Sequence, residues 1–278
     1  MNDIAKTLCI ALVAGTLALS HASAVRAADA SAWSDDTRSA IRLIAGSNTS
    51  GEPLRAGIEI KMQPGWHTYW RYPGDSGVPP RFDFSGSENL KSAKVLYPAP
   101  ALHSDESGQS LGYEGSVILP VLVTAKDPGK PVQVRLKIEY AVCEKLCVPA
   151  EGSAEFPLGA SISNQDSALK AAEAQVPKPV PAADVGLTAR RVNGGAKPLV
   201  MVDLTPPAGK PVQLFVEGPT PEWALPVPKP AQGAPDGHQH FAFELDGLPP
   251  GVDPKAQFEL TFTIVGSDRP LEVKTRLD

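Results

Sequence analysis

The sequence lacks the features that mark several common classes of protein. Its 278 residues contain no glycine-rich nucleotide loop, no Ser/His/Asp arrangement and no pair of carboxylates placed for hydrolysis. The formal net charge of −5 shows no basic excess, which argues against nucleic acid or an anionic membrane surface as a partner. No long amphipathic helical pattern runs through the chain, and beyond the N-terminus no apolar run is long enough to span a bilayer.

The N-terminus has the layout of a secretory signal peptide. Lys6 precedes an apolar run from Leu8 to Leu19, and small-residue cleavage sites ending at Ala24 and Ala27 follow. An uncleaved anchor is the alternative, but the run is short for a membrane span. We therefore expect residues 1–27 to be removed, and Cys9 with them. The mature protein is expected in an oxidising compartment, where its two remaining thiols can pair.

Those two thiols, Cys143 and Cys147, lie in the stretch from Val132 to Leu158. Before Cys143, apolar side chains fall on even positions and polar side chains on odd positions, which is the period of a strand with one buried face. The same parity resumes after Cys147, so we expect a hairpin with residues 144–146 at its tip. Both cysteines share the parity of the charged residues. They are therefore expected to point away from the core, accessible and close enough to bond.

The predicted bond between Cys143 and Cys147 has more than one interpretation. As a structural staple it would close about five residues, which stabilises by only ~2 kcal/mol in the loop-entropy model. A disulfide at an exposed, tight hairpin end is instead of the labile kind that takes part in thiol exchange. The residues favour an exchange-active disulfide. The alternative is a non-enzymatic interaction module in which the disulfide is a structural bridge. A copper-handling protein with the thiols as soft ligands is a third hypothesis, less favoured because methionine is scarce, with three residues.

A second unusual segment, Pro64 to Phe84, holds aromatic residues ahead of a turn rich in glycine and proline. The aromatic residues are Trp66, Tyr69, Trp70 and Tyr72. They either fill the end of a core, which is the favoured interpretation, or form an apolar surface for a partner. His67 is solitary and is expected to be a turn or surface residue. His238 and His240 alternate on one strand without an evident third ligand, so we predict no metal site and no cofactor.

Short strand patterns separated by turns fill most of the chain, which has 24 glycines and 29 prolines. Roughly seven strands between residues 35 and 160, with a polar loop at Leu102 to Ser110, predict an immunoglobulin-like β-sandwich. A helical patch at Asn164 to Gln175 and a Pro-rich connector follow, and then come strand patterns of a second sandwich. The predicted all-β organisation is a signal peptide (1–27), a redox sandwich (28–160), a short helix and linker (161–182) and a second sandwich (183–278).

The run WHTYW..PGDSG.PP, followed by YP.P, GYEG....LPV and Y.VCEKLCVP, resembles the N-terminal periplasmic domain of the DsbD family of thiol:disulfide interchange proteins. Within that family it looks most like the ScsB-like branch, whose two-sandwich arrangement would also account for the second half. The resemblance covers about residues 35 to 160. It implies that Cys143 and Cys147 pass electrons between a membrane-embedded DsbD-like donor and soluble thioredoxin-fold proteins in the periplasm. By the same analogy Cys147 forms the mixed disulfide, and the chain is a protein-disulfide reductase component with a separate electron donor.

In this family a cap loop shields the cysteine pair. Asp105 and Glu106 lie where the acidic part of that loop would fall, but Ser107 and Gly108 follow in place of a bulky aromatic. We therefore expect a more open disulfide than in the capped relatives. Partner choice would then depend on apolar contacts from the aromatic segment, namely from Tyr69, Trp70 or Tyr72.

Overall fold

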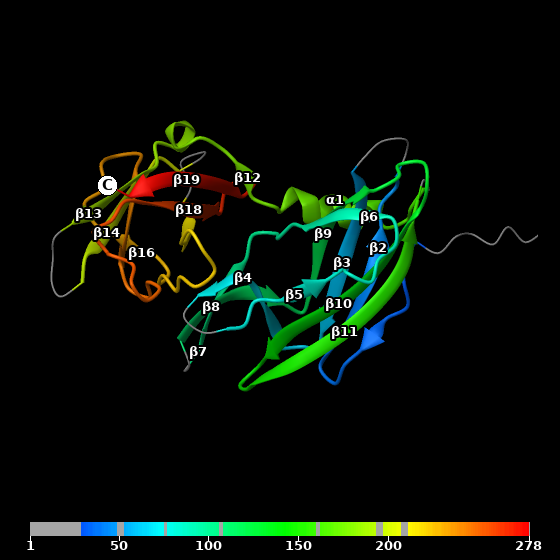
Figure 1. Ribbon diagram of the computed structural model, residues 1–278. Coiled ribbons are helices and arrows are strands. Elements are labelled where there is room, and N and C mark those ends of the chain that lie inside the picture. Colours follow the sequence, from blue (N-terminus) through cyan, green and yellow to red (C-terminus); the bar gives the residue numbers. More distant parts are fainter. Residues whose placement is uncertain are drawn as a thin grey trace, which may run out of the picture.

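The computed structural model describes residues 29–48, 53–74, 77–105, 108–159, 162–192, 197–206 and 211–277. The predicted signal peptide, residues 1–27, lies outside this part of the chain. Figure 1 shows two groups of strands side by side, one formed by residues 34–158 and the other by residues 178–277. Each group forms two sheets, which confirms the predicted all-β, immunoglobulin-like fold.

The first group of strands folds as a five-stranded and a six-stranded sheet. The five-stranded sheet has the order β1 (Ser34–Asp35), β2 (Ser39–Ala45), β3 (Leu54–Met62), β9 (Ser116–Ala125) and β6 (Leu90–Val95). The six-stranded sheet has the order β11 (Cys147–Leu158), β10 (Val132–Cys143), β4 (His67–Gly74), β8 (Gly108–Glu114) and β7 (Ala101–Asp105), with β5 (Arg81–Asp83) paired to β10. The long β10–β11 hairpin crosses one face of this group (Figure 1).

The predicted alternation decides which side chains of the hairpin are buried. Along β10 the even-numbered residues from Val132 to Val142 are buried, whereas Lys137 and Glu139 on the other face are exposed. The register of β10 and β11 ends at the pair Cys143 and Cys147, which confirms the predicted hairpin. Burying an aliphatic side chain of this kind stabilises a fold by about 1.5–3 kcal/mol, so the core holds the base of the hairpin firmly.

One predicted loop is wrong. Residues Leu102 to Ser110 were expected to form a polar loop, but β7 and β8 pair across it, from Ala101 with Gly112 to Asp105 with Gly108. Within this segment β7 is the edge strand of the six-stranded sheet, with β8 on one side of it. A polar sequence can form such an edge strand, because it needs few apolar side chains to do so.

The predicted helix and connector have different packing partners. Helix α1 (Asp166–Ala174) packs on the first group of strands, with Leu169 fully buried. Arg55 on β3 makes ion pairs with both ends of the helix, at 3.1 Å to Asp166 and 2.9 Å to Glu173. The connector beyond it contributes β12 (Lys178–Pro179), which pairs in parallel with β19 of the second group.

The second group forms two four-stranded sheets. One has the order β12, β19 (Leu271–Leu277), β18 (Phe258–Val265) and β15 (Gln213–Glu217). The other has the order β13 (Thr188–Val192), β14 (Leu199–Leu204), β17 (Gln239–Glu244) and β16 (Lys229–Ala231), and a 3₁₀ helix, η1 (Ala182–Val185), precedes it. Across the described ranges, none of the helices has the length and apolar character of a membrane span.

The two groups share buried contacts. The Tyr72 hydroxyl on β4 accepts a hydrogen bond from the backbone N–H of Leu225 and lies 3.4 Å from the carbonyl oxygen of the same residue. Buried apolar side chains of both halves form one continuous cluster. The strand β4 therefore belongs to the cysteine-bearing sheet and also contacts the second half of the chain.

Candidate functional site

The site is the closed end of the β10–β11 hairpin, where Cys143 and Cys147 form a disulfide. The last residue of β10 and the first of β11 supply the two sulfurs, so a regular strand pair holds both. The tip residues between them, Glu144, Lys145 and Leu146, are all exposed. A disulfide at the end of a hairpin of regular register confirms the predicted bond between these two cysteines.

The two sulfur-bearing residues differ in exposure. Cys147 is exposed, whereas Cys143 is only 2% exposed. Both were expected to be accessible, and for Cys143 this is wrong. Its side chain lies on the odd-numbered face as predicted, but that face is covered at this end of the sheet by residues of β4. Only one of the two residues is therefore open to an incoming reactant.

Tyr69 provides the cover. It forms a small buried cluster with Ala141 and Cys143, separate from the main core, and is 3% exposed. Its hydroxyl lies 2.8 Å from Sγ of Cys143 and 3.0 Å from Sγ of Cys147. The backbone at Gly77 packs against the ring. A Cβ atom at this position, where φ is +150°, would lie only 2.6 Å from two Tyr69 ring carbons. Glycine is required there because a side chain would clash with the ring.

Two histidines extend this face of the sheet. His67 on β4 is the register partner of Cys143 and is 8% exposed, so the expected turn or surface position for His67 is wrong. Its ring stacks on that of His103 from β7, with centroids 4.8 Å apart, and meets Tyr69 edge-on at 5.6 Å. Among the described residues, Nε2 of His103 is buried without a hydrogen-bond partner.

The other residues expected to bind partners are buried or only partly described. Trp70 is fully buried and Tyr72 is 5% exposed. Their even-numbered positions on β4 point them into the core, which confirms the favoured core interpretation. The prediction that these two side chains contact a partner directly is therefore wrong. Of the cap residues, Asp105 ends β7 with only its backbone described, and Glu106 lies outside the described residues.

Exposed apolar side chains near the disulfide come from different segments. Leu146 at the hairpin tip is 74% exposed, and Val78, next to the glycine that packs on Tyr69, is 54% exposed. Val78 also lines a hollow with Pro149 of β11, two residues beyond Cys147. Large exposed hydrophobic side chains of this kind are common at contact sites.

The histidines of the second half have an acidic partner that the sequence pattern did not reveal. Asp203 is the register partner of His240 on the neighbouring strand, and its two carboxylate oxygens lie 2.8 Å from Nδ1 of His238 and 2.6 Å from Nε2 of His240. Within the described part of the chain, no group of three or more His, Cys, Asp or Glu side chains has an arrangement that would hold a metal ion.

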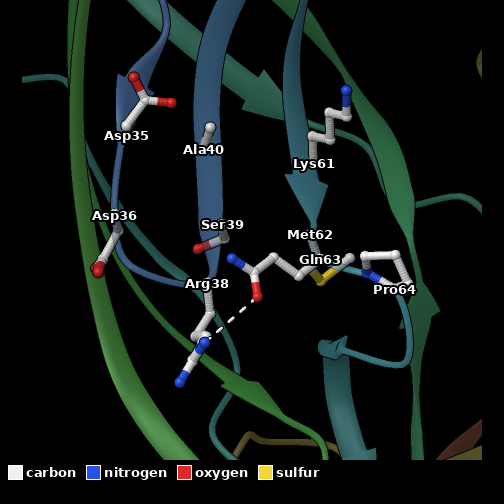
Figure 2. Close-up of a pocket in the computed structure, with 9 residues that line it drawn as sticks. All are labelled: Asp35, Asp36, Arg38, Ser39, Ala40, Lys61, Met62, Gln63 and Pro64. Carbon is white, nitrogen blue, oxygen red and sulfur yellow. Dashed lines mark hydrogen bonds between the residues drawn. The ribbon is translucent and has the colours of Figure 1, made fainter.

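A separate hollow lies where β2 begins and β3 ends (Figure 2). It has a volume of about 360 Å³ and is lined by charged and polar residues such as Asp35, Arg38 and Lys61. Arg38 donates a hydrogen bond to Gln63 across it, at 3.4 Å. Neither cysteine lines this hollow, and it holds no nucleophile and acid–base pair that would suggest chemistry of its own.

Sequence reasoning missed the position of Tyr69 against the two sulfurs and that of His103 against His67. Tyr69 could have been placed there, because its odd position puts it on the same face as His67 if β4 pairs with β10. That pairing joins residues more than 70 positions apart, and no local pattern predicts it. His103 carried no signal at all, because its strand was expected to be a loop.

The first half of the chain has relatives of known family. Residues 38–159 match the family model described as "Thiol:disulfide interchange protein DsbD, N-terminal". The structure is similar to that of the N-terminal periplasmic domain of ScsB from Proteus mirabilis, with a TM-score of 0.70 and 16% sequence identity over 90% of this chain and 98% of that chain. At this identity the likeness shows the fold alone.

A second solved structure, a chimeric titin Z1Z2 functionalized with a peptide from decorin, aligns at 11% identity over 90% of this chain and 97% of that chain. The TM-score of this alignment is 0.19. No curated protein matches the sequence.

Proposed function

Because residues 38–159 form an N-terminal domain of the DsbD family, similar to that of ScsB, and carry the Cys143–Cys147 disulfide, we propose that the chain passes electrons through this pair in the periplasm. The proposed donor is a membrane-embedded or thioredoxin-like dithiol protein, and the proposed acceptors are soluble thioredoxin-fold proteins. The protein is a thiol:disulfide interchange module. The proposal concerns its partners and the direction in which electrons flow between them.

The unequal exposure of the two cysteines carries the proposal. Exchange requires a thiolate to approach one sulfur in line with the disulfide bond, and access decides which sulfur is attacked. Cys147 is exposed and Cys143 is 2% exposed. We therefore assign Cys147 as the sulfur that forms the mixed disulfide and Cys143 as the sulfur that leaves. A staple needs no such difference between its two ends.

The surroundings of Cys147 suit a protein partner. Leu146 precedes it in the chain with 74% of its surface exposed. Val78, which follows the glycine that packs on Tyr69, is 54% exposed. A thioredoxin-fold partner that presents its own sulfur to Cys147 would cover these side chains, and loops around a reactive group select which partners approach. Leu146 and Val78 take over the contact role that we had expected of Trp70 and Tyr72.

The reduction potential of the disulfide tests the proposal. We expect it to equilibrate with glutathione or thioredoxin buffers under native conditions, with a potential above the value of about −300 mV that structural bridges fall below. The fraction of reduced disulfide is measured by alkylating the free thiols and recording the resulting mass shift. A bridge that is reduced only after denaturation would favour the structural-module alternative instead.

Single-cysteine variants test the assignment of the two sulfurs. Cys143→Ala leaves the exposed thiol and should form a mixed disulfide with an oxidised thioredoxin-fold protein, whereas Cys147→Ala leaves the buried thiol and should react much more slowly. Leu146→Ser should weaken this capture. Ile162→Ser is the matched control, because Ile162 is also highly exposed, at 87%, but lies outside the hairpin. Equal capture by both single-cysteine variants would contradict the assignment.

A further inference from the structure

We propose that Tyr69 is a catalytic residue of the exchange reaction, whose hydroxyl donates a hydrogen bond to the thiolate that forms on Cys143 when the disulfide opens. This inference rests on the proposed function and assigns one further group to the same site. It gives Tyr69 a chemical role in place of the contact role that the sequence suggested.

The geometry places this one hydroxyl against both reacting atoms. It lies 2.8 Å from Sγ of Cys143 and 3.0 Å from Sγ of Cys147. Tyr69 is 3% exposed, and the backbone at Gly77 packs closely against its ring. Because the ring is buried and packed against Gly77, we expect the hydroxyl to remain at the sulfurs when the bond between them breaks.

A donor is needed at this position because Cys143 is buried. A thiolate removed from water is destabilised by desolvation, which slows its departure as a leaving group. A disulfide sulfur accepts hydrogen bonds only weakly. An ionised acceptor forms a shorter and stronger hydrogen bond than a neutral one. The hydroxyl therefore stabilises the product of the cleavage step much more than the starting disulfide.

The thiolate of a donor dithiol protein attacks Sγ of Cys147, a bond forms between these two sulfurs, and the Cys143–Cys147 bond breaks. The bonding pair stays on Sγ of Cys143 as a thiolate, to which Tyr69 donates its hydrogen bond while keeping its proton. The second thiol of the donor then loses its proton and attacks the donor sulfur of the mixed disulfide. Cys147 is released as a thiolate, and the donor ends as a disulfide. The thiolates of Cys143 and Cys147 take up two protons from solvent, equal in number to those that the two donor thiols gave up, so the pair gains two electrons and two protons.

Other titratable groups lie on this face, and their ionisation would also affect the pH dependence of the exchange rate. His67 of β4 lies opposite Cys143, and His103 of β7 stacks on His67. Glu144 and Lys145 lie at the hairpin tip between the cysteines. The Tyr69 hydroxyl lies within hydrogen-bond distance of both sulfurs, and the test removes that atom alone.

The test compares Tyr69→Phe with Tyr140→Phe in the full chain. Both changes remove one buried hydroxyl, but that of Tyr140 bonds the hydroxyl of Ser39 at 2.7 Å on the core face. With dithiothreitol as the dithiol, Tyr69→Phe should slow reduction by about tenfold, the factor expected for one lost hydrogen bond to a charged group. Tyr140→Phe should leave the rate unchanged. In a Cys147→Ser background, Tyr69→Phe should also raise the pKa of the Cys143 thiol, read from its alkylation rate against pH.

The outcomes separate the two proposals. A wild-type disulfide that no dithiol reduces under native conditions overturns the proposed function, and the role of Tyr69 with it. Normal wild-type exchange, with an unchanged rate and an unchanged Cys143 thiol pKa in Tyr69→Phe, overturns the role of Tyr69 alone. If Tyr69→Phe fails to fold, a ring-fluorinated tyrosine at position 69 keeps the ring and strengthens the donor. It should lower the pKa of the Cys143 thiol, and no change would overturn the role of Tyr69.

Discussion

Arg71 of β4 and Glu217 of β15 form a bidentate ion pair that joins the two halves of the chain, with Nε and Nη2 of Arg71 at 2.9 Å and 2.7 Å from the two carboxylate oxygens of Glu217. Glu272 of β19 adds a third contact, at 2.6 Å from Nη2. Burial lowers the pKa of Arg71, but the two carboxylates outweigh burial and raise that pKa well above its ordinary value. Arg71 lies two residues from Tyr69, so the second half contacts the strand that covers the disulfide.

Replacing Arg71 by Gln should lower the free energy of unfolding by about 2 kcal/mol. The change leaves Glu217 and Glu272, with side chains only 13% and 18% exposed, as partly buried charges without their cation, which costs more than the loss of a surface pair. Arg135→Gln is the control, because Arg135 pairs with exposed carboxylates and should cost within ~1 kcal/mol. Urea unfolding measures both. Equal losses would show that the joint contributes no more than a surface ion pair.

A shortened chain that ends at Gln175 should fold and keep its exchange chemistry. The described residues that form the site, from His67 to Cys147, all precede Gln175, and the shortened chain keeps α1 with its ion pairs to Arg55. It also keeps the carbonyl of Gln175, which accepts a hydrogen bond from the N–H of Ala99 at 2.8 Å. Equilibration with glutathione measures the exchange.

The shortened chain should still be less stable than the full chain, because Arg71 and Tyr72 lose their partners in the second half. A change in redox equilibrium while the first half remains folded would contradict independence of the two halves. It would indicate that the second half positions β4, and with it Tyr69, over the disulfide.

Local periodicity was enough to predict the cysteine hairpin, because alternation along β10 and β11 records directly which face is buried. It could not predict that Cys143 is covered, since the covering residue Tyr69 comes from a strand paired 74 positions away. The same limit applies to His103, which meets His67 only through the order of strands in the sheet. Faces follow from parity within a strand, whereas contacts across a sheet follow from strand order, which one sequence does not encode locally.

Trp70→Ala should destabilise the first half, because this side chain lies in the core and not at a partner surface. Trp70 is 0% exposed, and truncating a buried aromatic side chain of this size costs about 3–5 kcal/mol. Trp66→Ala is the matched control, because Trp66 is only partly buried and stacks under Arg38. Urea unfolding of both variants decides the matter. A fully stable Trp70→Ala protein would contradict the core position of this side chain.

Alkaline pH should destabilise the protein in part through Tyr97. Burial is the main cause that raises the pKa of Tyr97 from 10.0 to about 12 in the folded protein, while the charge of Arg71 lowers it. Between these two values the unfolded chain loses the phenol proton and the folded chain keeps it. The contribution of Tyr97 is therefore fully present below pH 10 and is lost as the pH rises toward 12, at ~1.4 kcal/mol per pH unit. Tyr97→Phe should remove this dependence. Urea unfolding at pH 9 and at pH 12 should show that the wild type loses about 2 kcal/mol more of its free energy of unfolding than the variant does. Parallel curves for the two proteins would show that the phenol ionises at the same pH in both states.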